Sequence, residues 1–139
     1  MYKLFTLQEA NHMIPTVDRH LRAIQTAAAD VSDLRMQLER LHRHNLESRN
    51  LAEEIAFLTR LIEDAKAELD RLGVQVRDLQ AGIVDFPSQL GAEIVCLSWK
   101  QGTREITHYH RLNDSDAKPL AQSPQGPVRV LPRSKSIGS

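Results

Sequence analysis

The sequence predicts an α+β fold: a long antiparallel helical hairpin of coiled-coil type, followed by a small antiparallel β-meander. Two observations lead to this prediction. Apolar residues recur at spacings of three and four from residue 17 to residue 41 and again from residue 51 to residue 72. Apolar and polar residues then alternate in short runs as far as residue 112, with glycine-containing turns between them. We expect one domain over residues 1–112 and a proline- and serine-rich tail over residues 113–139.

The first helix has a clear start signal. Thr6 and Glu9 are spaced as a capping box, so the helix is expected to begin near Leu7. Pro15 predicts an interruption after Met13 and a second, longer helix over residues 15–43, because an interior proline removes a backbone hydrogen bond. The apolar positions of this segment form a heptad seam, namely Val17, Leu21, Ile24, Ala28, Val31, Leu34, Leu38 and Leu41.

A further helix is predicted over residues 51–72, with Asn50 and Glu53 as its N-terminal cap signal and Gly73 at its end. Its seam consists of Leu51, Ile55, Leu58, Ile62, Ala65, Leu69 and Leu72. Phe57 and Leu61 lie outside this seam, so the apolar stripe is wider than a contact between two helices requires. The sequence therefore predicts another helix or another subunit on that side, and a homo-oligomer.

Four strands are predicted over residues 74–77, 83–86, 93–100 and 105–112. Pro87 is expected to end the second strand, because proline cannot donate to a ladder. The connections are short, so consecutive strands are expected to pair antiparallel as a meander. A sheet of this size has too little core alone and must pack one face on the helices.

Composition excludes several classes of function. Lys plus Arg and Asp plus Glu number 18 each, and aromatic residues make up 4%, so nucleic acid is not an expected partner. No apolar run reaches the length of about eighteen residues that a membrane span needs, and the N-terminus lacks the pattern of a secretory signal. The lone Cys96 is typical of a reducing compartment. We expect a cytoplasmic protein without a membrane partner.

The candidate site lies in the strands. His108 and His110 point to the same face of their strand, and two imidazoles so placed can chelate a metal ion. Asp85 and Cys96 can come near them in a meander. The predicted metal ligands are His110, His108 and Asp85, with Glu105 or a helix carboxylate nearby, and the cofactor is a divalent metal; haem on a single histidine is the weaker variant. The competing interpretation makes both histidines rim residues, since no HExxH or CxxC motif accompanies them.

Trp99 and Cys96 have simpler interpretations. Trp99 alternates with Leu97 and Val95 and is expected in the core. Cys96 has Lys100 as its nearest basic neighbour in sequence, and it is expected to be a small buried hydrophobe and not a nucleophile.

Several motifs resemble those of one bacterial family. They are FTLQEANHMIP at the start, LGVQVRDLQAGIVDFP after the helices, a VCLSW strand, a Glu-Ile pair and a Tyr-His pair. Together they resemble the domain-of-unknown-function family 2203 over residues 4–112. The resemblance implies a long helical hairpin with a small sheet and no established activity, and it directs attention to Asp85, Trp99 and His110. The Phe-Ala-Gly-Arg-type segment typical of the family is replaced here by residues 115–119.

Two functional hypotheses follow. The first is a non-enzymatic, homo-oligomeric binding or scaffold module, in which the helices assemble the oligomer and the sheet recognises a partner such as another protein. The second is a metal-binding protein, or a metal-dependent enzyme, that uses His110, His108 and Asp85.

Overall fold

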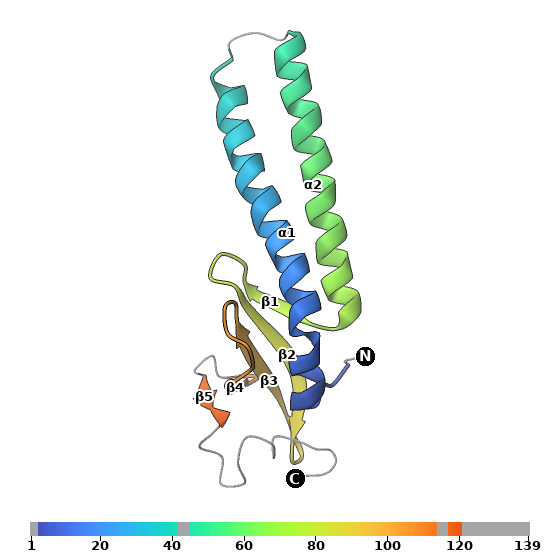
Figure 1. Ribbon diagram of the computed structural model, residues 1–139, viewed down its shortest axis with the longest axis vertical. Coiled ribbons are helices and arrows are strands. Elements are labelled where there is room, and N and C mark those ends of the chain that lie inside the picture. Colours follow the sequence, from blue (N-terminus) through green and yellow to red (C-terminus); the bar gives the residue numbers. More distant parts are fainter. Residues whose placement is uncertain (1–2, 42–44, 114–116, 121–139) are drawn as a thin grey trace.

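The computed structural model of the chain describes residues 3–41, 45–113 and 117–120. Two long helices precede a five-stranded antiparallel sheet, which confirms the predicted α+β fold (Figure 1). The helices are α1 (Leu7–Glu39) and α2 (Leu46–Leu72). The strands are β1 (Gln75–Asp78), β2 (Ile83–Leu90), β3 (Glu93–Lys100), β4 (His108–Arg111) and β5 (Lys118–Pro119).

The helices lie side by side, and the sheet packs at one end of the hairpin, against the N-terminal half of α1 (Figure 1). The strand order β1-β2-β3-β4-β5 follows the chain, as the short connections predict for a meander. The capping box is also confirmed: Thr6 Oγ1 accepts a hydrogen bond from the Glu9 amide, and the Glu9 carboxylate accepts one from the Thr6 amide. Within the described residues, neither helix has a segment apolar and long enough to cross a bilayer.

The predicted interruption at Pro15 is wrong, because α1 runs through this proline. Ile14 and Val17 are buried on either side of it, at 7% and 0% exposure. Packing of these turns on the sheet offsets the penalty of about 3 kcal/mol that an interior proline carries. The helix ends at Glu39, before the predicted end at residue 43; residues 42–44 lie outside the described ranges.

The second helix begins earlier than predicted. Asn45, and not Asn50, is its N-cap: the Asn45 side chain accepts from the Ser48 amide at 3.0 Å, and Ser48 Oγ accepts from the Asn45 amide at 2.9 Å. Asn-x-x-Ser satisfies two terminal amides reciprocally, as Ser/Thr-x-x-Glu does, and so adds a turn before residue 51. The end is as predicted, with Gly73 in the left-handed conformation at φ +91°.

Strand β2 passes through Pro87, so the predicted end at residue 86 is also wrong. The Pro87 carbonyl accepts a hydrogen bond from the Phe5 amide at 2.7 Å, on the side of β2 that faces away from β3. The amide nitrogen and the carbonyl of a strand residue point to the same neighbour, so the missing N–H falls on that side too. Pairing with β3 therefore continues uninterrupted from Ile83 to Leu90.

The last part of the sheet differs from the prediction in extent. Strand β4 begins at His108, later than residue 105. The meander then continues to β5, whose Lys118 and Pro119 pair with Tyr109 and His108 in the stretch predicted to be a tail. Leu120 follows at 1% exposure and belongs to the hydrophobic core.

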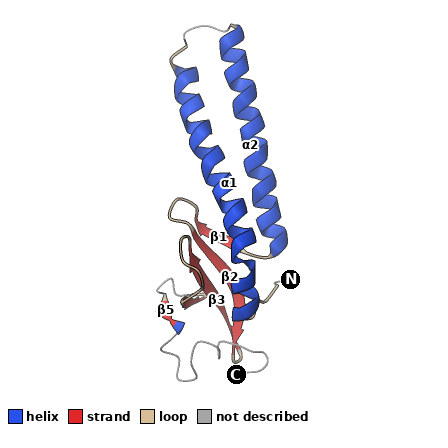
Figure 2. Ribbon diagram, in the orientation of Figure 1, coloured by secondary structure: helices blue, strands red, loops and turns tan. Residues whose placement is uncertain are grey.

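The core lies between α1 and one face of the sheet. It consists of Phe5, Ala10, Ile14, Val17, Leu21, Ile24, Leu69, Val74, Val84, Phe86, Val95, Leu97, Trp99, Ile106 and Leu120. Trp99 is 1% exposed, as predicted, and its indole N–H donates to the Thr103 carbonyl at 2.9 Å. The end of the hairpin that carries the connection between the helices projects beyond the sheet (Figure 2). In that projecting part, each helix packs mainly against the other helix of the hairpin. In α2, only Ser48 and Leu69 are buried.

Candidate functional site

The register of three neighbouring strands gathers polar residues on the sheet face opposite α1. Asp85 pairs with Ser98, and Cys96 of the same central strand pairs with His110. Directly paired residues in antiparallel strands project to the same face, and so do residues two apart in one strand. Asp85, Cys96, Ser98 and His110 therefore share one face, and together with Arg77 we call them the polar cluster.

Asp85 and His110 meet across the central strand. They belong to β2 and β4, with β3 between them. Asp85 pairs with Ser98 and His110 with Cys96, two residues away on β3, so the two side chains meet diagonally and not directly opposite each other. The β3 residues beneath them, Cys96 and Ser98, are small and leave room for the longer side chains. Asp85 Oδ2 lies 3.0 Å from His110 Nε2, and the two residues are only 3% and 7% exposed.

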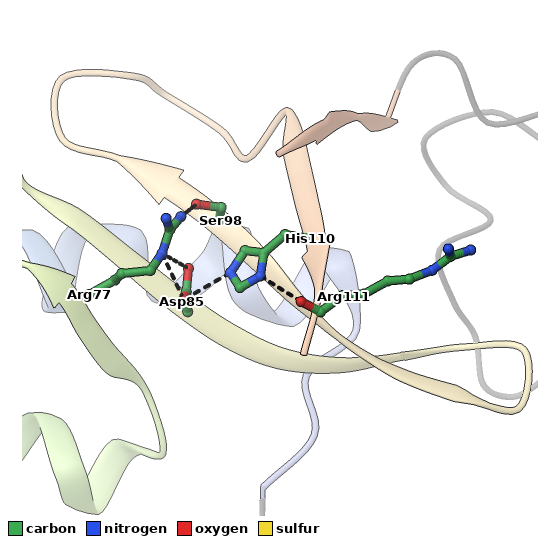
Figure 3. Close-up of polar contacts among 5 residues, drawn as sticks. All are labelled: Arg77, Asp85, Ser98, His110 and Arg111. Atoms are coloured by element: carbon green, nitrogen blue, oxygen red, sulfur yellow. Dashed lines mark hydrogen bonds and ion pairs between the residues drawn. The ribbon is translucent and has the colours of Figure 1, made fainter. Parts of the chain in front are cut away.

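Arg77 supplies the positive charge that pairs with the Asp85 carboxylate. Its Nε donates to the two carboxylate oxygens of Asp85 at 3.0 and 3.3 Å, and its Nη2 donates to Ser98 Oγ at 2.7 Å. Figure 3 shows Arg77 and His110 approaching Asp85 from opposite sides. The buried carboxylate is thus paired with a guanidinium on one side and hydrogen-bonded to an imidazole on the other, as a buried charge requires.

The other ring nitrogen of His110 fixes how the imidazole can act. Nδ1 lies 3.0 Å from the Arg111 carbonyl oxygen, which can only accept, so Nδ1 carries a proton in this contact (Figure 3). Nε2 is left to share a proton with Asp85 or to offer its lone pair to a metal ion. A histidine held through Nδ1 by a backbone carbonyl is a common arrangement among metal ligands.

Cys96 is buried, and its thiol is not activated as a nucleophile. Burial, together with the negative charge of Asp85, raises the pKa of the Cys96 thiol from 9.0 to about 11, although Arg77 acts in the opposite direction. The thiol therefore keeps its proton at neutral pH. Cysteine nucleophiles need a lowered pKa, so the raised pKa of the Cys96 thiol argues against covalent catalysis by this residue.

The structure brings together two of the four predicted ligands. Asp85 and His110 converge, and Cys96 lies beside them. His108 points to the same face, as predicted, but is exposed, with Nδ1 2.8 Å from Thr107 Oγ1. Glu105 is exposed before the start of β4 and is not part of the polar cluster.

Sequence reasoning missed Arg77, which it placed only within the predicted strand over residues 74–77. The one available signal was its position on an edge strand next to the strand of Asp85. That signal becomes specific only once the register is known, because the pairing of β1 with β2 is irregular between Val76 and Asp78.

Fold and site define an α+β protein in which a helical hairpin carries a small sheet, and a buried Asp–His pair on that sheet is joined by the partly exposed Arg77. A family model described as an uncharacterized conserved protein (DUF2203) matches residues 3–118, so the chain belongs to this family. The comparisons with curated proteins and with solved structures found no match.

Proposed function

We propose that this protein is a non-enzymatic scaffold that forms homo-oligomers through a face of the helical hairpin that includes one side of α2, and that it recognises a protein partner with its sheet. One observation carries the proposal. Leu46, Phe57 and Leu61 are 66%, 64% and 45% exposed. Positions four and eleven residues apart lie on the same side of a helix, so these three side chains form one apolar stripe, which we call the α2 stripe.

A second copy of the chain is the occupant that best fits the α2 stripe. The seam residues of the projecting hairpin, such as Leu34, Leu38, Ile55 and Leu58, are only partly buried between two helices. Two hairpins packed side by side would cover them, as in a four-helix bundle. The formal net charge of zero removes long-range repulsion between copies.

The size of the hairpin is also sufficient. A helix of 27 residues is about 40 Å long, and a face two helices wide measures about 20 Å across. The resulting area of about 800 Å² per partner is that of a standard stable interface.

A binding role is also favoured by two cavities near the sheet. One, of about 300 Å³, is lined by Ile24, Lys66, Leu69, Asp70, Val74, Val76 and Leu79. The other, of about 650 Å³, is lined by Gln25, Ala28, Ala29, Leu79, Gln80 and Gln101. These linings are mainly aliphatic and amide side chains, which suit recognition better than acid–base chemistry.

Sedimentation analysis of the full chain over a range of concentrations tests the proposal. The wild type is expected to sediment as a dimer or larger species. The double variant Phe57→Glu/Leu61→Glu is expected to sediment as a monomer, because association would bury two charges in the interface. Its circular dichroism spectrum is expected to be unchanged.

Met36→Glu is the matched control. Met36 is 51% exposed but lies two residues from both Leu34 and Leu38, hence on the other side of α1. This variant is expected to associate like the wild type. A wild type that stays monomeric throughout, or a double variant that still associates, would contradict the proposal.

A further inference from the structure

We propose that Asp85, Cys96 and His110 bind a divalent transition-metal ion, with Zn²⁺ as the best fit, on the face of the sheet opposite α1. Carboxylate oxygen, thiolate sulfur and imidazole nitrogen are the three ligand types that zinc takes in proteins. In the part of the chain that the structure describes, these residues are the one group of three His, Cys, Asp or Glu side chains whose ligand atoms converge, all within 4.8 Å of one another.

The distances suit a metal ion after a small adjustment of side chains. Zinc bonds of about 2.0–2.3 Å place tetrahedral ligand atoms about 3.3–3.6 Å apart. Asp85 Oδ2 and His110 Nε2 are already 3.0 Å apart. Side-chain rotations that move atoms by about 1 Å would place all three within bonding distance, without any change of strand register.

The surrounding contacts are those that orient metal ligands. His110 Nδ1 donates to the Arg111 carbonyl, which directs the Nε2 lone pair toward Asp85 and Cys96. Arg77 holds the Asp85 carboxylate and is itself bonded to Ser98. All three ligands stand on adjacent strands, which fix side chains more rigidly than loops do.

Binding exchanges protons for the metal. The Cys96 thiol proton, and any proton shared between His110 Nε2 and Asp85, are released to solvent as the ion takes their place. The three ligands leave a fourth zinc position for water or a ligand from a partner. The hydrogen-bonded contact without metal needs only Asp85 and His110, whereas the metal site also needs Cys96. Cys96→Ser is therefore the discriminating variant.

The full chain, purified without a polyhistidine tag and treated with a chelator, should be titrated with Co²⁺ and then with Zn²⁺ in competition. We expect one equivalent of Co²⁺ with a thiolate-to-cobalt charge-transfer band, and a melting temperature that rises with Zn²⁺. Cys96→Ser is expected to remove the band. Both Cys96→Ser and Asp85→Asn should weaken Zn²⁺ binding by about 100-fold or more, since even outer contacts of metal sites contribute about 10–100-fold.

His108→Ala is the matched control, because His108 lies on the same strand and face but outside the converging group. Its metal affinity should equal that of the wild type. A wild type that binds no stoichiometric metal would overturn the proposal, as would Cys96→Ser and Asp85→Asn variants of unchanged affinity. If Cys96→Ser fails to fold, Cys96→Ala replaces it with the same expected loss of the band. The outcome is independent of oligomerisation, because the polar cluster shares no residue with the α2 stripe.

Discussion

Asp85 connects three strands on the face of the sheet opposite α1. Its carboxylate, on β2, bonds both Arg77 of β1 and His110 of β4. We predict that Asp85→Ala lowers the free energy of unfolding by about 3 kcal/mol, because it removes the ion-pair partner of Arg77 and a hydrogen-bond partner of the buried His110. Urea denaturation of the metal-free protein measures this loss.

An exposed ion pair on the same sheet supplies the control. Arg111 and Glu93 are 3.1 Å apart with side chains 53% and 47% exposed, so Glu93→Ala should cost less than about 1 kcal/mol. If Asp85→Ala and Glu93→Ala lowered the free energy of unfolding equally, the burial of Asp85 would add nothing to the stability that its contacts contribute.

Cys96 gives the fold a specific dependence on alkaline pH. Its pKa is raised from 9.0 to about 11 on folding, so its contribution to stability is present in full below pH 9.0 and is lost as the pH rises through about 11. We predict that the free energy of unfolding of the metal-free wild type falls more steeply over this interval than that of Cys96→Ser. Parallel urea titrations across the interval measure the difference, and identical slopes would contradict the assignment.

The residues of the polar cluster could be named from the sequence only in part. Alternation along a strand put His108 and His110 on one face, and that is correct. Alternation does not say which neighbour each residue meets across the sheet. The register sets His110 beside Cys96 and puts His108 in the same row as Ser98 and Asp85. It is nevertheless His110 that reaches Asp85, diagonally across β3, whereas His108 is exposed.

The turns of the sheet differ in how strictly they require glycine. Gly82 and Gly91 both have positive φ, at +75° and +63°. A Cβ at Gly82 would lie 2.6 Å from Gln101 Cβ, while at Gly91 it would meet nothing within 4 Å. We predict that Gly91→Ala costs about 1–2 kcal/mol from backbone conformation alone, and that Gly82→Ala costs clearly more.

Thermal unfolding of the two glycine variants, side by side with the wild type, measures the difference. Gln101 also bonds Gln25 and Asp18 of α1, so its displacement in Gly82→Ala should loosen the contact between sheet and helix. Equal melting temperatures for the two variants would contradict this account.

Much of the secondary structure followed from local signals, although the local cap at Asn45 was missed and tertiary contacts overrode the signals of two prolines. The cap at Thr6, the glycine at the end of α2 and the bounds of β3 were all predictable, because each depends on neighbouring residues. In the seam predicted for α1, Ala27 is buried where Ala28 was expected, and the helix ends before Leu41. Pro15 and Pro87 misled because their cost depends on surroundings. Burial of Ile14 and Val17 stabilises α1 through Pro15. At Pro87, the position that lacks an N–H donor faces away from β3, so the pairing of β2 with β3 loses no hydrogen bond.

At the scale of the whole molecule, the hairpin divides into a part anchored on the sheet and a part that projects. We predict that amide hydrogen exchange in residues 46–62 slows as protein concentration rises, because self-association would cover the α2 stripe. Exchange around the buried Leu69 should not change with concentration, nor should any residue of Phe57→Glu/Leu61→Glu. Exchange in residues 46–62 that is independent of concentration in the wild type would count against association through α2.

The sequence by itself determined the architecture of this protein: two amphipathic helices, then a meander of short strands with one face on the helices. Periodicity and caps act over a few residues, so they can be read along the chain. The tertiary structure alone decided the register of the sheet, the path through both prolines and the meeting of Arg77, Asp85, Cys96 and His110. These features depend on contacts between residues far apart in sequence. A local sequence pattern carries no information about the free energy of such contacts.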